Sequence, residues 1–590
     1  MERLDFYSGL VAAFVAGGYR VIFGWLPQFV SVNSQRENKW VTWMVSITSA
    51  VAQALNKSQV FTAFVTGLLF GRPLEGLAVG AVIELMFLGV FQIGASTPPQ
   101  PTLATIMTTI FVIRAGATTE EALTIVMPIA ILGQTLFMAA ITFNQLALGI
   151  GKQKADAGDI KGVDHANTFW QFVFILQTLF PAFLGGFIGI PAVKAVTAWI
   201  GANAGWVMGG MGLVAGLLPA LGFALLLYQM GTKFIGFLFL GMAVALYMKP
   251  STLALAVMGI AIALIYMLVT RKEGSFDLPP AEATAQAKDR KIKLTDEDLD
   301  AMWWRHYGLF SSASWEVLGG LGMAQAMVPV IRRLYQTKED VSAALKRHMT
   351  FYNTNPWLGA IIPGILASME EEKANGGAVD EAAIQGVKVA MMGPFAGVGD
   401  SLFWATYIPI YVAICASWAQ SGNTVLMWLA PLVSGGITIA THLWIQRFGI
   451  RWGYQRGLSA LQDLQQQNLL SDLSTAATVV GQFVVGGLVV TLVNLQIRWA
   501  PSFFGTSPIK IQSIIDSIQP KLLPILVFFF CYWLLRRGKT ALFVMIVLLI
   551  VCLVGAYPIP LALFNNNSIL GAPIEPAKTS LQIMMHMFGG

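Results

Sequence analysis

The most constraining feature of this sequence is a set of uncharged apolar runs, each long enough to cross a lipid bilayer. Residues 251–270 contain no charged side chain, and an α-helix needs about 20 residues to span the hydrocarbon core. Charged residues make up only 12% of the chain, whereas soluble domains contain about 25%. The sequence therefore predicts an all-α integral membrane protein. Other such runs are residues 123–149, 169–189 and 475–496, and the pair flanking Arg536.

Charged side chains interrupt several of these apolar runs. Arg20, Glu75 and Glu84 each lie inside an apolar stretch. A charge at the centre of a bilayer costs at least ~2.5–3.5 kcal/mol, so such residues usually face the protein interior or a polar cavity. The pattern predicts broken or re-entrant helices around a buried polar site.

One polar stretch divides the chain. Residues 271–294 carry Pro279–Pro280 and several Lys and Arg side chains, and this basic excess predicts a cytoplasmic position. The run Thr295-Asp296-Glu297-Asp298 then predicts a capping box at the start of the next helix. We predict a membrane domain over residues 1–270, a cytoplasmic linker over residues 271–294 and a second domain over residues 295–590. In that second domain, amphipathic helices precede C-terminal membrane helices.

The residues that carry most enzymatic and metal chemistry are sparse. The 3 cysteines stand apart, and the 5 histidines show no metal-ligand spacing, so we predict no disulfide, metal, cofactor or catalytic residue. No nucleophile elbow, P-loop or dinucleotide fingerprint occurs. The net charge of +6 is typical of Lys and Arg beside membrane segments, and it requires no nucleic-acid partner. These observations indicate a transporter-like membrane protein with a buried polar site.

In the first half, the candidate site combines Glu84 with the turn that follows it. Gly94 and two prolines break the helix there and expose backbone groups. Gln92 and Gln100 add side chains that both donate and accept hydrogen bonds. A sugar needs such groups because its hydroxyls do both. The alternative is that Glu84 pairs with a nearby cation and the Pro-Pro turn is only a connector.

In the second half, the candidate residues are Glu316, His348, Asn353 and Asp400. His348 and Asn353 lie near a predicted helix end, because the residue before Pro356 disfavours the helical conformation. Residues 393–400 predict a glycine-rich loop that ends in Asp400. Neither half holds a complete constellation, so we predict one sugar site built from both.

Some of these residues also have a purely structural interpretation. Glu84 and Glu316 are the principal predicted acceptors for sugar hydroxyls. His348 is also compatible with a purely structural role, and it or Asn353 could serve only to shape the turn before Pro356. The acidic run 370–372 is typical of a solvated helix face.

Several short motifs carry a family resemblance. In the first half they are residues 66–71 (TGLLFG), 83–85 (IEL) and 92–95 (QIGA). In the second half they are residues 314–316 (SWE), 327–335 (MVPVIRRLY), 347–354 (RHMTFYNT), 369–371 (MEE), 392–400 (MGPFAGVGD) and 451–457 (RWGYQRG). The first set resembles enzyme IIC, and the second resembles enzyme IID, of the mannose/fructose/sorbose class of bacterial phosphotransferase permeases.

This resemblance implies a function and a set of partners. Enzymes IIC and IID together carry a hexose-type sugar across the bacterial cytoplasmic membrane. A phosphohistidine on a soluble enzyme IIB phosphorylates the sugar and is recharged through IIA, HPr and enzyme I from phosphoenolpyruvate. The resemblance also implies a homotrimer in the lipid bilayer. Covalent fusion of IIC to IID would fix their stoichiometry and raise their effective concentration.

Two other function classes remain open at this point. One is an ion-coupled secondary transporter that uses Glu84 and Glu316 as proton or sodium sites. The other is a non-transporting membrane scaffold or receptor. The state of the sugar on arrival distinguishes a phosphotransferase from an ion-coupled transporter, because only a phosphotransferase delivers the sugar phosphorylated.

Overall fold

The structure is a computed structural model. It describes residues 5–29, 39–89, 99–117, 119–203, 205–270, 292–377, 379–457, 469–497, 511–539, 541–556 and 570–571. Helices form most of these segments, and the only strands among them are β1 (Gln496–Ile497) and β2 (Leu570–Gly571), which pair antiparallel. The prediction of an all-α membrane protein is therefore confirmed.

The first half is a series of helices of very unequal length. Short helices meet at tight turns, as where Ser58 caps the N-terminus of α4 by accepting from the Phe61 amide at 3.2 Å. Its elements are α1 (Phe6–Ala13), η1 (Phe14–Gly18), η2 (Val21–Trp25), α3 (Lys39–Lys57), α4 (Gln59–Leu69), α5 (Pro73–Phe87), α6 (Pro101–Ile110), η3 (Phe111–Ala115), α7 (Thr119–Asp156), α8 (Ile160–Asn203), α9 (Gly205–Met230), α10 (Ile235–Met248) and α11 (Thr252–Thr270).

The second half begins at the predicted capping box. The Thr295 hydroxyl accepts from the Asp298 amide, and the Asp298 carboxylate accepts from the Thr295 amide, which confirms that prediction. Its elements are α12 (Asp296–His306), α13 (Gly320–Leu334), α14 (Lys338–Met349), η5 (Leu358–Ala360), α15 (Ile361–Ala374), α16 (Glu381–Gly399), η6 (Asp400–Tyr407), α17 (Ile408–Ala419), α18 (Thr424–Arg456), α20 (Leu469–Leu492), α21 (Ile511–Ile518), α22 (Leu522–Arg536) and α23 (Ala541–Ala556).

Five helices in the described chain are long and apolar enough to cross a membrane: Ile160–Gly189, Thr252–Thr270, Glu381–Ala419, Thr424–Arg456 and Thr475–Leu492. Two further helix pairs are long and apolar enough only when their two helices are taken together. The pair near the N-terminus is bent by 43°, and the pair of α21 and α22 is bent by 78°. The bent pairs confirm the expectation of broken helices. Two of the five spans lie between residues 381 and 456, where the sequence mixes charged with apolar residues and we had predicted amphipathic helices.

One predicted loop is wrong. Residues 393–400 lie within a continuous helical path in which α16 passes directly into the π-helical η6. Pro394 is inside α16, and proline is tolerated in membrane helices where neighbouring groups satisfy the freed backbone. Asp400 therefore lies at a π-helical bulge rather than at the end of a glycine-rich loop.

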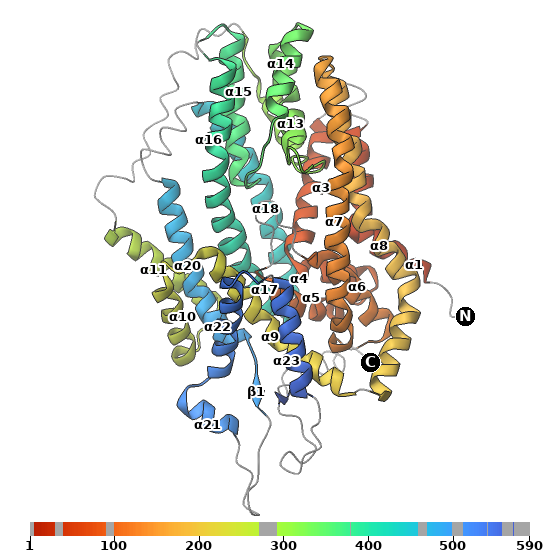
Figure 1. The fold of residues 1–590 in the computed structure, drawn as a ribbon, viewed down its shortest axis with the longest axis vertical. Coiled ribbons are helices and arrows are strands. Elements are labelled where there is room, and N and C mark those ends of the chain that lie inside the picture. Colours follow the sequence, from red (N-terminus) through yellow and green to blue (C-terminus); the bar gives the residue numbers. More distant parts are fainter. Residues whose placement is uncertain are drawn as a thin grey trace, which may run out of the picture.

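The two halves interleave closely. Figure 1 shows α10 and α11 of the first half beside α20 of the second, while α13, α14 and α15 gather at one end of the molecule. A Cβ added at Gly241 on α10 would lie 1.9 Å from the Phe483 carbonyl oxygen on α20. A Cβ at Gly486 on α20 would lie 2.0 Å from the Leu238 carbonyl oxygen on α10. These glycines let the backbones of the two halves touch.

Candidate functional site

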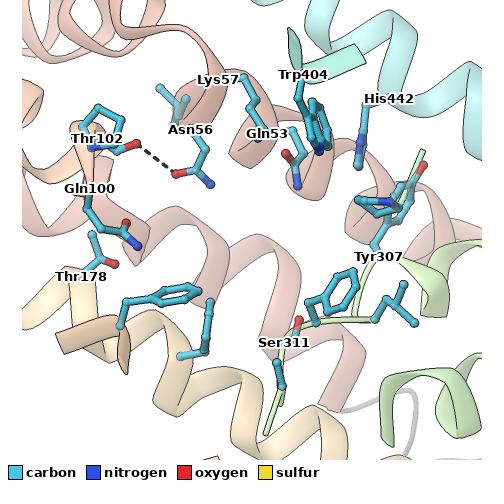
Figure 2. Close-up of a pocket in the computed structure, with 18 of the residues that line it drawn as sticks. Gln53, Asn56, Lys57, Gln100, Thr102, Thr178, Tyr307, Ser311, Trp404 and His442 are labelled. Atoms are coloured by element: carbon cyan, nitrogen blue, oxygen red, sulfur yellow. Dashed lines mark hydrogen bonds between the residues drawn. The ribbon is translucent and has the colours of Figure 1, made fainter. Parts of the chain in front are cut away.

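A cavity of about 440 Å³ lies where the two halves meet. Figure 2 shows Gln100 and Thr178 on one side of it and Tyr307 and His442 on the other. The polar side chains from the first half are Tyr19, Arg20, Gln53, Asn56, Lys57, Gln59, Glu84, Gln100, Thr102, Gln177 and Thr178. Those from the second half are His306, Tyr307, Ser311, Asn353, Thr354, Asp400, His442 and Gln446.

The buried carboxylate of Glu84 reaches the cavity beside the N-terminus of α4. It accepts hydrogen bonds from the Ser58 hydroxyl at 3.1 Å and from the Val60 amide at 3.0 Å. A helix N-terminus favours a negative charge because its first amides point at it. The partners of Glu84 are therefore at this helix end, rather than the nearby cation of the alternative interpretation. A carboxylate has about four acceptor positions, so capacity remains for a hydroxyl in the cavity.

Asp400 is positioned by the loop that follows α14. The Asn355 amide donates to the Asp400 carboxylate at 2.9 Å, and the Asn355 carbonyl accepts from the Trp357 and Leu358 amides at 3.0 and 3.2 Å. This one side chain closes its own turn and links it to η6. Because η6 is π-helical, its residues are rotated from their ordinary helical positions, as is common near functional sites.

A cation from the first half meets an aromatic ring from the second. The Lys57 ammonium lies 3.9 Å from the centroid of the Trp404 ring, and both side chains line the cavity that Asp400 also reaches. The cavity thus contains carboxylates, amides, an ammonium group and an aromatic face. This combination can bind a polyhydroxylated ring through hydrogen bonds and through its apolar face.

The structure brings Glu84, Gln100, Asn353 and Asp400 to this cavity. Gln92 lies outside the described residues. The remaining two predicted residues, Glu316 and His348, do not line the cavity.

Glu316 lies on the surface. It belongs to a tight turn closed by the Leu318 amide, which donates to the Ser314 carbonyl at 2.8 Å. Its side chain is 53% exposed and forms an ion pair with Lys152. The turn directs this carboxylate outward, so the geometry contradicts our expectation that Glu316 shares a site with Glu84.

His348 belongs to a separate buried cluster between α14 and α15. Its Nε2 lies 2.7 Å from the Glu370 carboxylate, which also accepts from Arg347 at 2.6 Å and from the Tyr335 hydroxyl at 2.6 Å. Burial opposes ionisation of Glu370, but the hydrogen bonds from His348 and Arg347 outweigh it and hold the pKa of Glu370 well below its usual value. Burial lowers the pKa of His348, and the bond to Glu370 offsets this only in part. The ring is therefore a neutral donor with a structural role.

The acidic run 370–372 is not a solvated helix face. Glu370 and Glu371 are fully buried. Glu371 accepts from the Leu294 amide at 2.7 Å and from the Tyr454 hydroxyl at 2.6 Å. Glu371 on α15 thus links Leu294, at the start of the second half, to Tyr454 on α18.

Sequence reasoning missed several cavity residues. Lys57 and Gln59 belong to a polar run, residues 56–59, between two apolar stretches, and that run was the available signal. Trp404, His306 and His442 gave no signal, because each stands alone among unrelated neighbours. Within the described residues, no group of three or more His, Cys, Asp or Glu side chains is arranged to hold a metal ion.

Comparison with known proteins assigns both halves. A model of the PTS system mannose/fructose/sorbose family IID component matches residues 293–559, and one of the PTS system sorbose-specific IIC component matches residues 39–265. The chain is 34% identical to the mannose-specific EIID component of Escherichia coli K12, over 46% of this chain and 96% of that protein.

Two further relatives agree with this division. Identity is 41% to the sorbose-specific EIID component of Klebsiella pneumoniae, over 39% of this chain and 84% of that protein. Identity is 24% to the fructose permease IIC component of Bacillus subtilis, over 39% of this chain and 87% of that protein.

Proposed function

Because this chain belongs to the mannose/fructose/sorbose family of phosphotransferase-system permeases and carries a IIC and a IID component in one polypeptide, we propose that the cavity between its halves is the sugar site. The chain is a membrane component of phosphotransferase sugar transport. Such components work with a sugar and with a cytoplasmic IIB partner. The observation that carries the proposal is that charged and amide side chains of both halves line one cavity.

The cavity suits a hexose in size and chemistry. Its volume of about 440 Å³ falls in the range of about 300–1,000 Å³ that is usual for small-molecule sites. Glu84 and Asp400 offer carboxylate acceptors, while Gln100 and Asn353 offer amide groups that donate and accept. Trp404 offers a ring against which the apolar face of a sugar can pack.

Sugar binding and phosphoryl transfer are divided between this chain and its soluble partners. The residues of this chain hold and orient the sugar between the two halves. The phosphoryl group comes from a phosphohistidine on the soluble IIB protein, which IIA, HPr and enzyme I recharge from phosphoenolpyruvate. The family membership supports this scheme over an ion-coupled secondary transporter. The exposure of Glu316 also removes one of the two carboxylates that the ion-coupled alternative required.

The test is uptake into vesicles containing the full chain. Phosphoenolpyruvate, enzyme I, HPr, IIA and IIB are placed on the side that faces IIB. Labelled hexose is supplied on the opposite side, and the product on the IIB side is analysed. We expect sugar phosphate to form only when all components are present. Accumulation of free sugar under an ion gradient, without phosphoenolpyruvate, would contradict the proposal.

We also propose the orientation and assembly of the chain. Linker 271–294 and the basic turn 536–539 face the cytoplasm, the membrane is the bacterial cytoplasmic membrane, and three copies assemble. Single cysteines at Ser275 and Gly538, in a background without native cysteines, should react with an impermeant reagent only after the cells are opened. Reaction of either cysteine in intact cells would show that it faces the outside and would contradict the proposed orientation. Native mass spectrometry of the purified chain tests the trimer.

A further inference from the structure

The N-terminal segment, residues 5–29, is held at both ends. Near its start, the Arg114 guanidinium donates to the Asp5 carboxylate at 2.8 Å, and Asp5 is the only carboxylic acid in the segment. Near its end, the Trp25 indole N–H donates to the Thr168 carbonyl at 2.7 Å. Between these points the segment bends by 43°. The IIC family model matches from residue 39 onward, so family membership assigns no role to this segment.

Arg20 lies at the bend, between the helical stretches 6–18 and 21–29, and it lines the cavity. Its side chain is deeply enclosed by protein, but none of its nitrogen atoms is sealed from solvent. The accessible surface of these nitrogens therefore faces the cavity. Among the residues that the structure describes, the guanidinium has no hydrogen-bond partner and no carboxylate to balance its charge.

This lack of a partner sets Arg20 apart from the buried arginines of the described chain. Arg305 pairs with Asp164 at 3.2 Å. Arg347 pairs with Glu370 at 2.6 Å. An enclosed charge is expensive unless it is paired, and an ionisable side chain inside a membrane segment commonly marks the path of a substrate. The counter-ion of Arg20 is therefore to be sought in a ligand of the cavity.

The two carboxylates of the cavity are engaged away from Arg20. Glu84 is bound at the N-terminus of α4. Asp400 accepts from Asn355 and attracts the Lys57 ammonium. Neither carboxylate interacts with Arg20. The described residues of the cavity therefore leave the positive charge of Arg20 unbalanced.

The helices that flank the bend supply neutral polar groups. On α8, the Ile175 side chain lies 2.7 Å from the position of a Cβ at Gly17. On α3, the Thr48 hydroxyl donates to the Phe23 carbonyl at 3.2 Å. Three side chains of these two helices line the cavity: Gln53, Gln177 and Thr178. Amides and hydroxyls both donate and accept hydrogen bonds, so they suit the hydroxyls of a sugar whose charged group is bound by Arg20.

We propose that Arg20 is the counter-ion for an anionic oxygen group on the sugar in the cavity. The inference rests on the proposed function of the cavity and narrows its ligand class. A guanidinium matches such a group because its planar fork binds a carboxylate or a phosphate through two parallel hydrogen bonds. Two sources carry this chemistry: the carboxylate of an incoming acidic sugar and the phosphoryl group of the sugar phosphate product.

The test measures the affinity of the purified full chain for matched probes by calorimetry. Each set contains a hexose, its uronate, its uronamide and its 6-phosphate, in the gluco, manno and galacto series. The uronamide keeps the shape of the uronate without its charge. Arg20→Gln removes the positive charge and keeps an amide donor. The matched control is Arg72→Gln, which removes the same charge at the surface, where Arg72 pairs with Glu75.

In the wild type, we expect an anionic probe to bind about ten- to a hundredfold more tightly than the hexose and the uronamide, as a hydrogen bond to a charged group implies. Arg20→Gln should abolish this preference, and Arg72→Gln should keep it. Preference for the uronate identifies an acidic sugar as the substrate, whereas preference for the 6-phosphate alone assigns Arg20 to the product.

Two results would overturn the inference and leave the proposed function of the cavity standing. One is that the wild type binds the hexose but prefers no anionic probe. The other is that the preference survives in Arg20→Gln. If the wild type binds no probe in any series, the proposed function of the cavity fails together with the inference.

Thermal unfolding gives an independent measure of the role of Arg20. Because Arg20 has no partner within the described chain, ligand-free Arg20→Gln should melt at or above the temperature of the wild type. The preferred anionic probe should raise the melting temperature of the wild type and of Arg72→Gln, but not that of Arg20→Gln. A lower melting temperature of ligand-free Arg20→Gln, or its failure to fold, would show that Arg20 stabilises the fold and would overturn the inference.

Discussion

The Arg305 guanidinium donates to the Asp164 carboxylate at 3.2 Å, and neither side chain is more than 2% exposed. Asp164 belongs to α8 of the first half and Arg305 to α12 of the second, so this ion pair joins the two halves in a water-excluded interface. Gln325 extends it by donating to the other Asp164 oxygen at 2.7 Å. Removing one partner of such a pair strands the other as an uncompensated buried charge.

Replacement of Asp164 by Ala should therefore separate the halves. We expect a loss of about 3–5 kcal/mol of stability, because the buried Arg305 guanidinium loses the Asp164 carboxylate. A protease site placed in linker 271–291 allows the halves to be cut apart after purification. Copurification of the two fragments then measures their association.

The matched control is Lys152→Ala. Lys152 and Glu316 also form an ion pair between the halves, but both side chains are about half exposed. Exposed pairs are worth about 0–1 kcal/mol, so the fragments should stay together. Equal retention of the fragments in both variants would show that the buried pair is not what holds the halves.

The contact between α10 and α20 should tolerate no side chain at Gly241. A Cβ there would lie 1.9 Å from the Phe483 carbonyl oxygen, so Gly241→Ala must push the helices apart. We expect a loss of about 1–3 kcal/mol, which is typical of overpacking, measured by thermal unfolding in detergent. Gly236 on the same helix has open space at its Cβ position, and Gly236→Ala should melt with the wild type. Coincident melting curves for the two variants would refute this prediction.

Sugar affinity should depend on Glu84 and not on Glu75, although both lie on α5. Glu84→Gln keeps an acceptor for Ser58 and Val60 but loses the charge. A buried hydrogen bond to a charged group is worth about 1.5–3 kcal/mol, so we expect binding to weaken roughly ten- to a hundredfold. Glu75 pairs with Arg72 at the surface. Calorimetry on Glu75→Gln and Glu316→Gln should therefore give the wild-type affinity, and a similar loss in either would place the site elsewhere.

The stability of the chain should fall as the pH drops below the usual histidine pKa of 6.5. Burial lowers the pKa of His348 in the folded state, so between the two values the unfolded chain binds more protons, and stability rises with pH. His348→Gln retains a donor for Glu370 but cannot titrate. Its unfolding free energy should depend less on pH, by at most about 1.4 kcal/mol per pH unit.

The measurement for His348 is chemical unfolding between pH 5 and 8. Glu370 stays ionised in the folded state across that range, because its pKa lies well below the usual 4.5. The stability that Glu370 contributes is present above the unfolded-state value and declines only under more acidic conditions. Parallel stability curves for the wild type and His348→Gln would mean that this histidine keeps an ordinary pKa.

The sequence alone determined the class of this protein and its two-part organisation. Uncharged runs such as residues 251–270 require a membrane, because their length and composition leave no other stable environment. The capping box at Thr295 is also a local property, since both partners lie within one turn. The family motifs are local in the same sense. Glu84 was recognisable as a cavity residue because a lone carboxylate in an apolar run needs polar surroundings.

Tertiary structure decided everything that depends on which surfaces meet. Glu316 points outward because its tight turn and Lys152 direct it there. Glu370 is buried because Arg347 on α14 balances its charge and His348 on the same helix donates a hydrogen bond to it. Lys57 contacts the Trp404 ring, and Gln446 links His442 to His306, only because α3, α12, α18 and η6 converge on one cavity. Such pairs are separated by about 140 residues or more in the chain. No sequence periodicity specifies them, because they arise from packing between helices that are far apart in the chain.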